Sequence, residues 1–217
     1  TDIDVPLGFW RSVGASANGF MFDTFIDELA HAADIDPLQF RLDLARSEHR
    51  PSASVIEAVR EMSAWTGNTP DGIGRGVAFT HSFGTPVAEV IEVEDTGAGI
   101  KINKCWIAAD FGVVLDPRIV EAQMISGVIY GMSAAMQGEI TFSNGAVEQE
   151  NFHDYGALRM HTVPNFEVRL LENNSFIGGA GEPSTPPSMP ALGNALFDLT
   201  GTRARELPLI KTFNLIL

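Results

Sequence analysis

Residues 87–108 have the sequence VAEVIEVEDTGAGIKINKCWIA, and this stretch decides the fold. Its two ends, residues 87–94 and 100–108, are rich in valine and isoleucine, which favour strands. The residues between them, Asp95-Thr96-Gly97-Ala98-Gly99, have the composition of a turn. We therefore predict a β-hairpin in the middle of the chain.

Before the hairpin, apolar residues recur at helical spacing. Met21, Phe25 and Leu29 lie on one side of a first helix. Asp36 is a suitable N-cap for a second helix, and Pro37 suits its first turn because the missing N–H costs nothing there. The expected elements are a loop at 7–19, helices at 20–33, 37–47 and 51–65, and a linker at 68–76.

After the hairpin, the pattern mixes helices and strands. The expected elements are a long helix at 117–136, a second hairpin at 139–142 and 146–149, a strand at 166–171 and a helix at 187–199. The chain thus has an α+β pattern, with mixed sheets and packed helices. We expect a mainly helical segment at 1–70 and an α+β domain at 71–217.

The composition of the 217 residues limits the classes of function. Hydrophobic residues make up 45% and charged residues 19%, as in globular proteins, and no apolar run is long enough to span a bilayer. The formal net charge of −14 makes nucleic acid an unlikely partner. Cys105 is the single cysteine, so we expect a buried small apolar side chain and no disulfide within the chain. The opening residues 1–6 lack an initiator Met and are expected to come from the middle of a longer protein.

A carboxylate in a glycine-rich turn is the first candidate for chemistry. In Gly178-Gly179-Ala180-Gly181-Glu182-Pro183 the small residues let the backbone approach a neighbour closely. Pro183 restricts Glu182 to an extended conformation, so one carboxylate is presented from a stiff loop. Taken alone, such a glutamate is more often solvated surface than a catalytic group.

Three further segments contain polar residues in unusual surroundings. Gly8-Phe9-Trp10-Arg11-Ser12-Val13-Gly14 could bind an anionic or oxo group through its N–H groups, or be a plain connecting loop with a packed Trp and a surface Arg. In the helix after Pro117, Ser126, Gly127 and Gly131 favour close helix packing, and Gln123 is expected to hydrogen-bond a buried group. His153, Asp154 and His161 match no common zinc or iron spacing, so a structural cluster is the expectation.

The order of these segments resembles a known family. The series comprises residues 8–14, 25–33, 36–38, 110–117, Gln123, Gly127, 131–135, 138–142, 151–155, 181–183 and 190–195. Together they resemble the C-terminal part of the molybdopterin-binding subunit of the xanthine dehydrogenase/aldehyde oxidase family, of the isoquinoline 1-oxidoreductase beta-subunit type. The resemblance covers nearly the whole chain, and it implies the molybdenum-cofactor-binding fold of that family.

The resemblance implies roles for individual residues. Glu182 would be the catalytic base, acting on a hydroxyl bound to molybdenum. Trp10, Arg11, Ser12, Gly181 and Gln123 would border the cofactor, with the Arg11 backbone near an oxo ligand and no side chain ligating the metal. Val13 would wall the substrate pocket. Xanthine-type relatives have a Phe there, so the resemblance favours an aldehyde or an N-heteroaromatic substrate over a purine.

The resemblance also implies a cofactor and partners. The cofactor would be molybdenum–molybdopterin cytosine dinucleotide, shared with another chain because the family's Gly-Gln-Gly segment is absent here. Electrons would leave through a [2Fe-2S] cluster in a partner subunit, since one cysteine cannot ligate it, and then reach an acceptor such as cytochrome c. The remaining part of the molybdenum subunit would complete the site. Related subunits are often exported, so a periplasmic location is expected, with the cytoplasm as the alternative.

Two other hypotheses belong to different functional classes. The chain could be a non-catalytic structural subunit of such a complex that docks the electron-transfer partner through its acidic surface. It could also be a general small-molecule binding domain whose glycine-rich turns hold a ligand. The first predicts that Glu182 is dispensable, and the second predicts a stable monomer that binds its ligand alone.

Overall fold

The computed structural model describes residues 8–217, so the expectation about residues 1–6 lies outside the described part. Within residues 8–217, five helices and six strands follow one another, with a short 3-10 helix near the end. They are α1 (Gly14–Ala32), α2 (Pro37–Glu48), α3 (Arg50–Met62), β1 (Ile73–Ser82), β2 (Thr85–Asp95), β3 (Ile100–Asp110), α4 (Pro117–Gln137), β4 (Phe142–Ser143), β5 (Ala146–Val147), β6 (Asn165–Leu171), α5 (Thr185–Thr200) and η1 (Leu209–Lys211).

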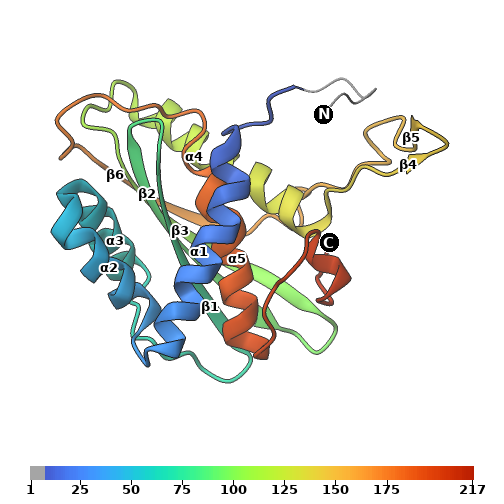
Figure 1. The fold of residues 1–217 in the computed structure, drawn as a ribbon, viewed down its shortest axis with the longest axis horizontal. Coiled ribbons are helices and arrows are strands. Elements are labelled where there is room, and N and C mark those ends of the chain that lie inside the picture. Colours follow the sequence, from blue (N-terminus) through green and yellow to red (C-terminus); the bar gives the residue numbers. More distant parts are fainter. Residues whose placement is uncertain (1–7) are drawn as a thin grey trace.

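A four-stranded mixed sheet forms the centre of the molecule (Figure 1). Its order is β1-β2-β3-β6, and β2 is antiparallel to both of its neighbours, β1 and β3. The predicted hairpin is confirmed, because Val87 of β2 pairs with Ala109 of β3 and the turn lies at 96–99. β6 lies parallel to β3, so the chain returns over one face of the sheet before it forms β6.

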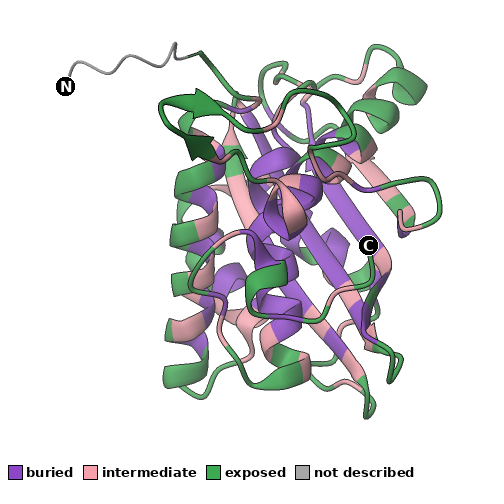
Figure 2. Cartoon of the chain, turned by 90° about the vertical axis from the view of Figure 1, so that its right-hand side faces the viewer, coloured by how far each residue is buried: buried purple, intermediate pink, exposed green. Residues whose placement is uncertain are grey.

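Helices cover both faces of this sheet, which confirms the α+β class. On one face α2 and α3 pack against residues such as Val77, Val90 and Trp106. On the other face α5 and α4 pack against Val87, Ile91 and the other strand residues of the larger core. Figure 2 shows that the central strands are largely buried. The helices before residue 70 thus share a core with the strands after it, and the division at that residue stays a prediction.

The expected linker at 68–76 is wrong in its second half, because β1 begins at Ile73. A Cβ on Gly76 would lie 2.1 Å from the Ala195 nitrogen, and one on Gly74 would lie 2.4 Å from the Ala195 oxygen. The backbone of α5 therefore lies directly on β1. Gly74 and Gly76 allow a close contact between helix and strand. From composition alone, a glycine-rich strand of this kind could not be distinguished from a linker.

The expected loop at 7–19 is also wrong in its second half, since α1 begins at Gly14. A Cβ on Gly19 would come within 3.2 Å of Pro186 at the start of α5. Here too, the small residue allows two helices to cross closely. The helix α5 itself begins at Thr185, two residues before the expected start.

The long helix and the second hairpin are confirmed as α4 and as β4–β5, which is only two residue pairs long. By length and hydropathy, α4 is long and apolar enough to cross a membrane, contrary to the expectation that no segment would be. In the folded chain, 44% of this apolar window is buried. Its glycines contact α5: a Cβ on Gly127 would lie 2.0 Å from the Ser184 Oγ. This agrees with the packing role expected for Gly127.

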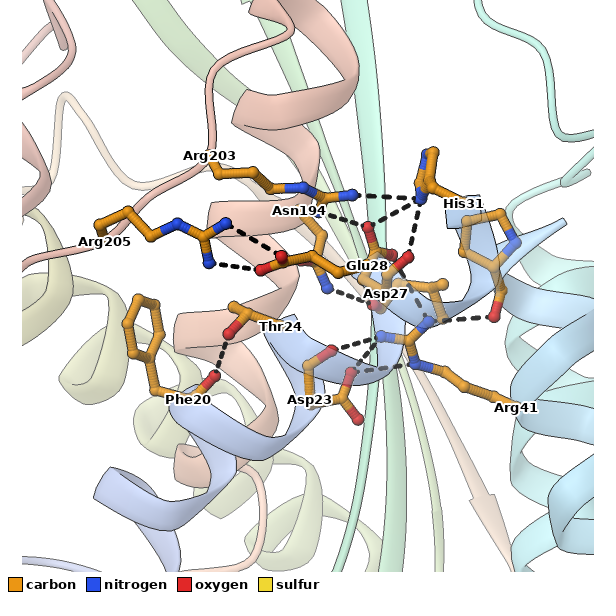
Figure 3. A network of polar contacts seen from close by, with 12 residues as sticks. Phe20, Asp23, Thr24, Asp27, Glu28, His31, Arg41, Asn194, Arg203 and Arg205 are labelled. Carbon is orange, nitrogen blue, oxygen red and sulfur yellow. Dashed lines mark hydrogen bonds and ion pairs between the residues drawn. The ribbon is translucent and has the colours of Figure 1, made fainter. Parts of the chain in front are cut away.

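A buried charge network fixes α1 to α2 and to the C-terminal segment (Figure 3). The Arg41 guanidinium bonds the Asp23 carboxylate and lies 3.5 Å from Asp27 Oδ1. Asp27 Oδ2 in turn accepts a hydrogen bond of 2.6 Å from Arg203. All three of the α1 and α2 side chains are almost fully buried.

Candidate active site

Three segments that are far apart in the sequence meet at Arg11. Its Nε donates to the Gly181 oxygen at 2.7 Å, and its Nη2 bonds the same oxygen. Its Nη1 donates to Ser126 Oγ at 3.0 Å, and Nη2 donates to Gln123 Oε1 at 3.1 Å. The loop before α1, the exposed side of α4 and the turn before α5 are therefore joined by one guanidinium.

The neighbouring residue holds the carboxylate of Glu182. The Ser12 N–H donates to Glu182 Oε1 at 3.0 Å. The Glu182 carbonyl accepts from the Thr185 N–H at 3.0 Å, so the turn leads directly into α5. Glu182 is half-buried and Pro183 is buried behind it. The carboxylate thus has a fixed place at the edge of the molecule.

The loop that holds Glu182 has an unusual backbone. Ser12 and Val13 have φ values of 66° and 51°, in the left-handed region that non-glycine residues rarely adopt. Such residues cost on the order of 1–3 kcal/mol each and gather at functional sites. The buried Ser12 hydroxyl supports the loop, since it bonds the Arg11 oxygen and Ser16 Oγ. Val13 is the N-cap of α1 and gives that helix no side-chain cap.

A cavity of about 410 Å³ opens beside Trp10. It is lined by α4 residues and by the segment at 155–158. The Trp10 and Tyr130 rings lie 4.7 Å apart, and the Arg11 guanidinium lies 5.8 Å from the Tyr130 ring centroid. Burial lowers the pKa of Arg11, while Tyr130 and Glu182 act in the opposite direction. Most side chains that line the cavity are apolar or aromatic, and the Arg11 cation lies at its edge.

Residues 25–164 match the family model of the molybdopterin cofactor-binding domain. The chain belongs to this family. The match includes Gln123 and ends before Gly181, and similarity to whole proteins extends further. The beta subunit of isoquinoline 1-oxidoreductase from Brevundimonas diminuta is 34% identical over 94% of this chain and 27% of its own length. A nicotinate dehydrogenase subunit of Pseudomonas putida is 31% identical over 94% of this chain and 19% of its own length.

Solved structures agree with this family membership at the level of the fold. The aldehyde oxidoreductase of Desulfovibrio gigas superposes with a TM-score of 0.68 at 11% identity, over 92% of this chain and 40% of that chain. The chain therefore spans about a quarter of the curated relatives it matches and less than half of this solved chain. The resemblance inferred from the ordered motifs is confirmed.

The residues singled out from the sequence come together in this family's fold. Arg11, Ser12, Gly181 and Glu182 form one contact group with Gln123, and Trp10 lies against Tyr130 beside it. One expectation is wrong: Gln123 bonds no buried group, because it lies on the exposed side of α4 and accepts from Arg11. Val13 is 49% exposed and does not line the cavity beside Trp10.

Sequence reasoning missed two residues of this group. Ser126 was assigned to helix packing, and Tyr130 was not singled out. The signal was available, since positions 123, 126 and 130 are three and four residues apart and lie on one side of a helix. Elsewhere, Cys105 is buried and free, as expected. His153 lies 3.1 Å from Asp154, and no cluster of three metal-binding side chains occurs among residues 8–217.

The open side of the contact group around Arg11 and Glu182 suits a molybdenum cofactor. Among residues 8–217, a Cβ on Gly181 would meet nothing closer than Gln123 Oε1 at 4.0 Å, so this part of the chain leaves space in front of the turn. The first turn of α1 has no acidic residue and no side-chain cap beside it. Its N–H groups carry partial positive charge, which favours anionic or oxo groups. These residues therefore fit a group that approaches from outside the chain.

Proposed function

We propose that this chain supplies the base-bearing loop of a molybdenum hydroxylase that oxidises an aldehyde or an N-heteroaromatic compound. The curated relatives are named as an isoquinoline oxidoreductase and a nicotinate dehydrogenase, which supports this substrate class. The observation that carries the proposal is the Glu182 carboxylate, held by the Ser12 amide on a stiff turn at an open face. The hypothesis of a non-catalytic subunit does not explain why a carboxylate is held in this position.

In this proposal Glu182 acts as the general base. When bound, the molybdenum cofactor supplies the oxidising centre and the water-derived oxygen for the substrate. Glu182 accepts the proton at its carboxylate, and the Ser12 amide keeps that carboxylate turned toward the open side. Trp10, Arg11, Ser12, Gly181 and Gln123 border the cofactor, which we propose to be the cytosine dinucleotide form. Val13 forms part of the substrate pocket.

Exposed apolar residues around the site support completion by a further polypeptide segment. Phe9 is 92% and Leu115 is 80% exposed, and Ile119, Phe176 and Ile177 are also exposed. Large apolar patches usually mark interfaces. We propose that the remaining part of the molybdenum subunit covers this face and brings most of the cofactor's contacts.

The electron path in this proposal lies outside the chain. A partner subunit carries a [2Fe-2S] cluster, because the single Cys105 is buried within the core. A cytochrome c is the proposed later acceptor. We propose a periplasmic location, with a cytoplasmic one as the alternative. Fractionation together with identification of each subunit through mass spectrometry tests these points.

The test of the function uses the purified complex and the Glu182→Gln variant. The substitution keeps the size of the side chain and its ability to accept from Ser12, and it removes the base. We expect turnover with aldehydes and N-heteroaromatics to fall about 10²–10⁴-fold, because general base catalysis contributes a factor of this size. Molybdenum content and subunit composition should equal those of the unaltered complex. Full activity of this variant would instead favour the structural-subunit hypothesis.

A further inference from the structure

Two contacts join the neighbouring residues Arg11 and Ser12 to the neighbouring residues Gly181 and Glu182. In one the donor is a side chain and the acceptor is backbone, and in the other the donor is backbone and the acceptor is a side chain. The Arg11 side chain bonds the backbone oxygen of Gly181, and the Ser12 backbone N–H bonds the side chain of Glu182. The Gly181 oxygen belongs to the peptide group that joins Gly181 to Glu182. The Arg11 guanidinium therefore fixes the peptide plane from which the carboxylate projects, while Ser12 fixes the carboxylate itself.

Arg11 is in turn held by α4. Ser126 Oγ accepts from Nη1 at 3.0 Å, and both Gln123 Oε1 and the Gln123 carbonyl accept from Nη2. Helix α4 is anchored to α5 through Ser184 Oγ, which donates to the Met124 oxygen at 2.9 Å. The turn is thus braced between α4 and α5, two helices of the main core.

The chemistry of arginine suits this role better than that of lysine. A guanidinium is planar and donates in several fixed directions, so it can hold one carbonyl with two N–H groups and still reach two other acceptors. A lysine ammonium carries a charge but has no such fork. Because Nε, Nη1 and Nη2 all donate to partners within the chain, most of the N–H groups of the guanidinium are already engaged in holding the turn.

We propose that Arg11 is a positioning residue that sets the orientation of the Glu182 carboxylate through its side chain, with Gln123 and Ser126 as its anchors on α4. This role concerns the guanidinium, and it is distinct from any contact of the Arg11 backbone with the cofactor. It rests on the proposed function, since Glu182 must be the base for its orientation to matter.

The test compares Arg11→Lys and Arg11→Gln in the assembled, molybdenum-loaded complex. We expect kcat to fall about 10²-fold, the effect of a displacement of about 1 Å at a catalytic group. KM should stay within about twofold, because no substrate contact is lost. Molybdenum content should be unchanged. Arg169→Gln, which breaks a surface ion pair with Glu61, is the matched control and should leave both constants unchanged.

Chemical rescue separates positioning from a structural role. Arg11→Gly leaves room for a small cation, so added guanidinium should restore part of kcat, whereas ammonium should not. If the Arg11 variants fail to assemble, Gln123→Leu decides. Its side chain is exposed and its loss removes one anchor of Arg11, so kcat should fall several-fold.

The failures of the two proposals are distinguishable. A raised KM with unchanged kcat in Arg11→Lys would overturn the positioning role and indicate substrate binding. A loss of rate that only follows a loss of molybdenum would overturn it in favour of cofactor retention. An unchanged kcat in Gln123→Leu would overturn it as well. In all three cases Glu182→Gln would still be inactive if the proposed function holds, and it would be active if that function is wrong.

Discussion

Arg41→Met is the substitution that tests the packing of α1 most directly. Arg41 donates to Asp23 Oδ1 at 2.9 Å, to the Asp23 carbonyl at 2.8 Å and to the Pro37 carbonyl at 3.0 Å (Figure 3). Methionine fills most of the volume and removes the charge. Asp27 keeps its pair with Arg203, but Asp23 is left in the core with the Phe79 N–H.

The size of the stability loss in Arg41→Met follows from the number of buried charges that lose their partner. One buried carboxylate without its partner costs about 3–5 kcal/mol of unfolding free energy. Burial already raises the pKa of Asp23, and Arg41 is the largest opposing influence. In the variant, Asp23 therefore takes up a proton more readily in the folded state than in the unfolded state. The destabilisation should be largest at neutral pH and should shrink as the pH falls toward 5.

Urea unfolding followed by circular dichroism at pH 5 and pH 8 measures this loss. Arg46→Met is the matched control, because Arg46 is half exposed and pairs with Glu57 on the surface. The control should lose no more than about 0.5 kcal/mol. A loss below about 1 kcal/mol for Arg41→Met, or an equal loss at both pH values, would refute the reasoning.

Two further predictions concern the core and the site. Burial raises the pKa of Glu89 well above its usual value, and neither of its oxygens has a hydrogen-bond partner within residues 8–217, so the folded state holds a proton that the unfolded chain releases above about pH 4.5. The stability should therefore fall as the pH rises, and Glu89→Gln should be more stable at pH 8 and flatten that dependence in urea titrations; a steeper dependence would contradict this. Gly181→Ala should change the unfolding free energy by less than about 1 kcal/mol, since the added Cβ meets, among residues 8–217, only Gln123 Oε1 at 4.0 Å. The added Cβ should nevertheless occupy space that the cofactor needs and so lower the molybdenum content measured by elemental analysis. A normal molybdenum content would show that the cofactor does not approach Gly181.

Elements with their own periodicity or turn could be predicted from the sequence. The β2–β3 hairpin consists of two strands rich in valine and isoleucine on either side of a glycine turn, and α4 begins at an Asp-Pro signal. The grouping of Arg11 with Glu182, 170 and more residues apart, came only from the order of motifs that resembles a family. A pattern within one short segment cannot show that two residues so far apart in the sequence lie close together in the fold.

The parts that were missed depend on contacts between elements. Gly74 and Gly76 have the composition of a linker, and only the position of α5 shows that they are a strand surface. Gln123 has apolar neighbours in sequence, but the side of the helix on which it lies is exposed. Its partner is decided by where the loop before α1 lies in space.

The parallel pairing of β3 with β6 has an evolutionary consequence. The connection between these strands carries α4 and then an arm at residues 138–164, whose β4–β5 tip projects from the body (Figure 1). The register of the sheet does not constrain the length of that arm, and doubling a flexible loop costs only about 0.6 kcal/mol. Insertions and deletions at the β4–β5 tip of this arm, near residues 143–147, can accumulate among homologues without disturbing the sheet, so this tip is a place where lineages can diversify.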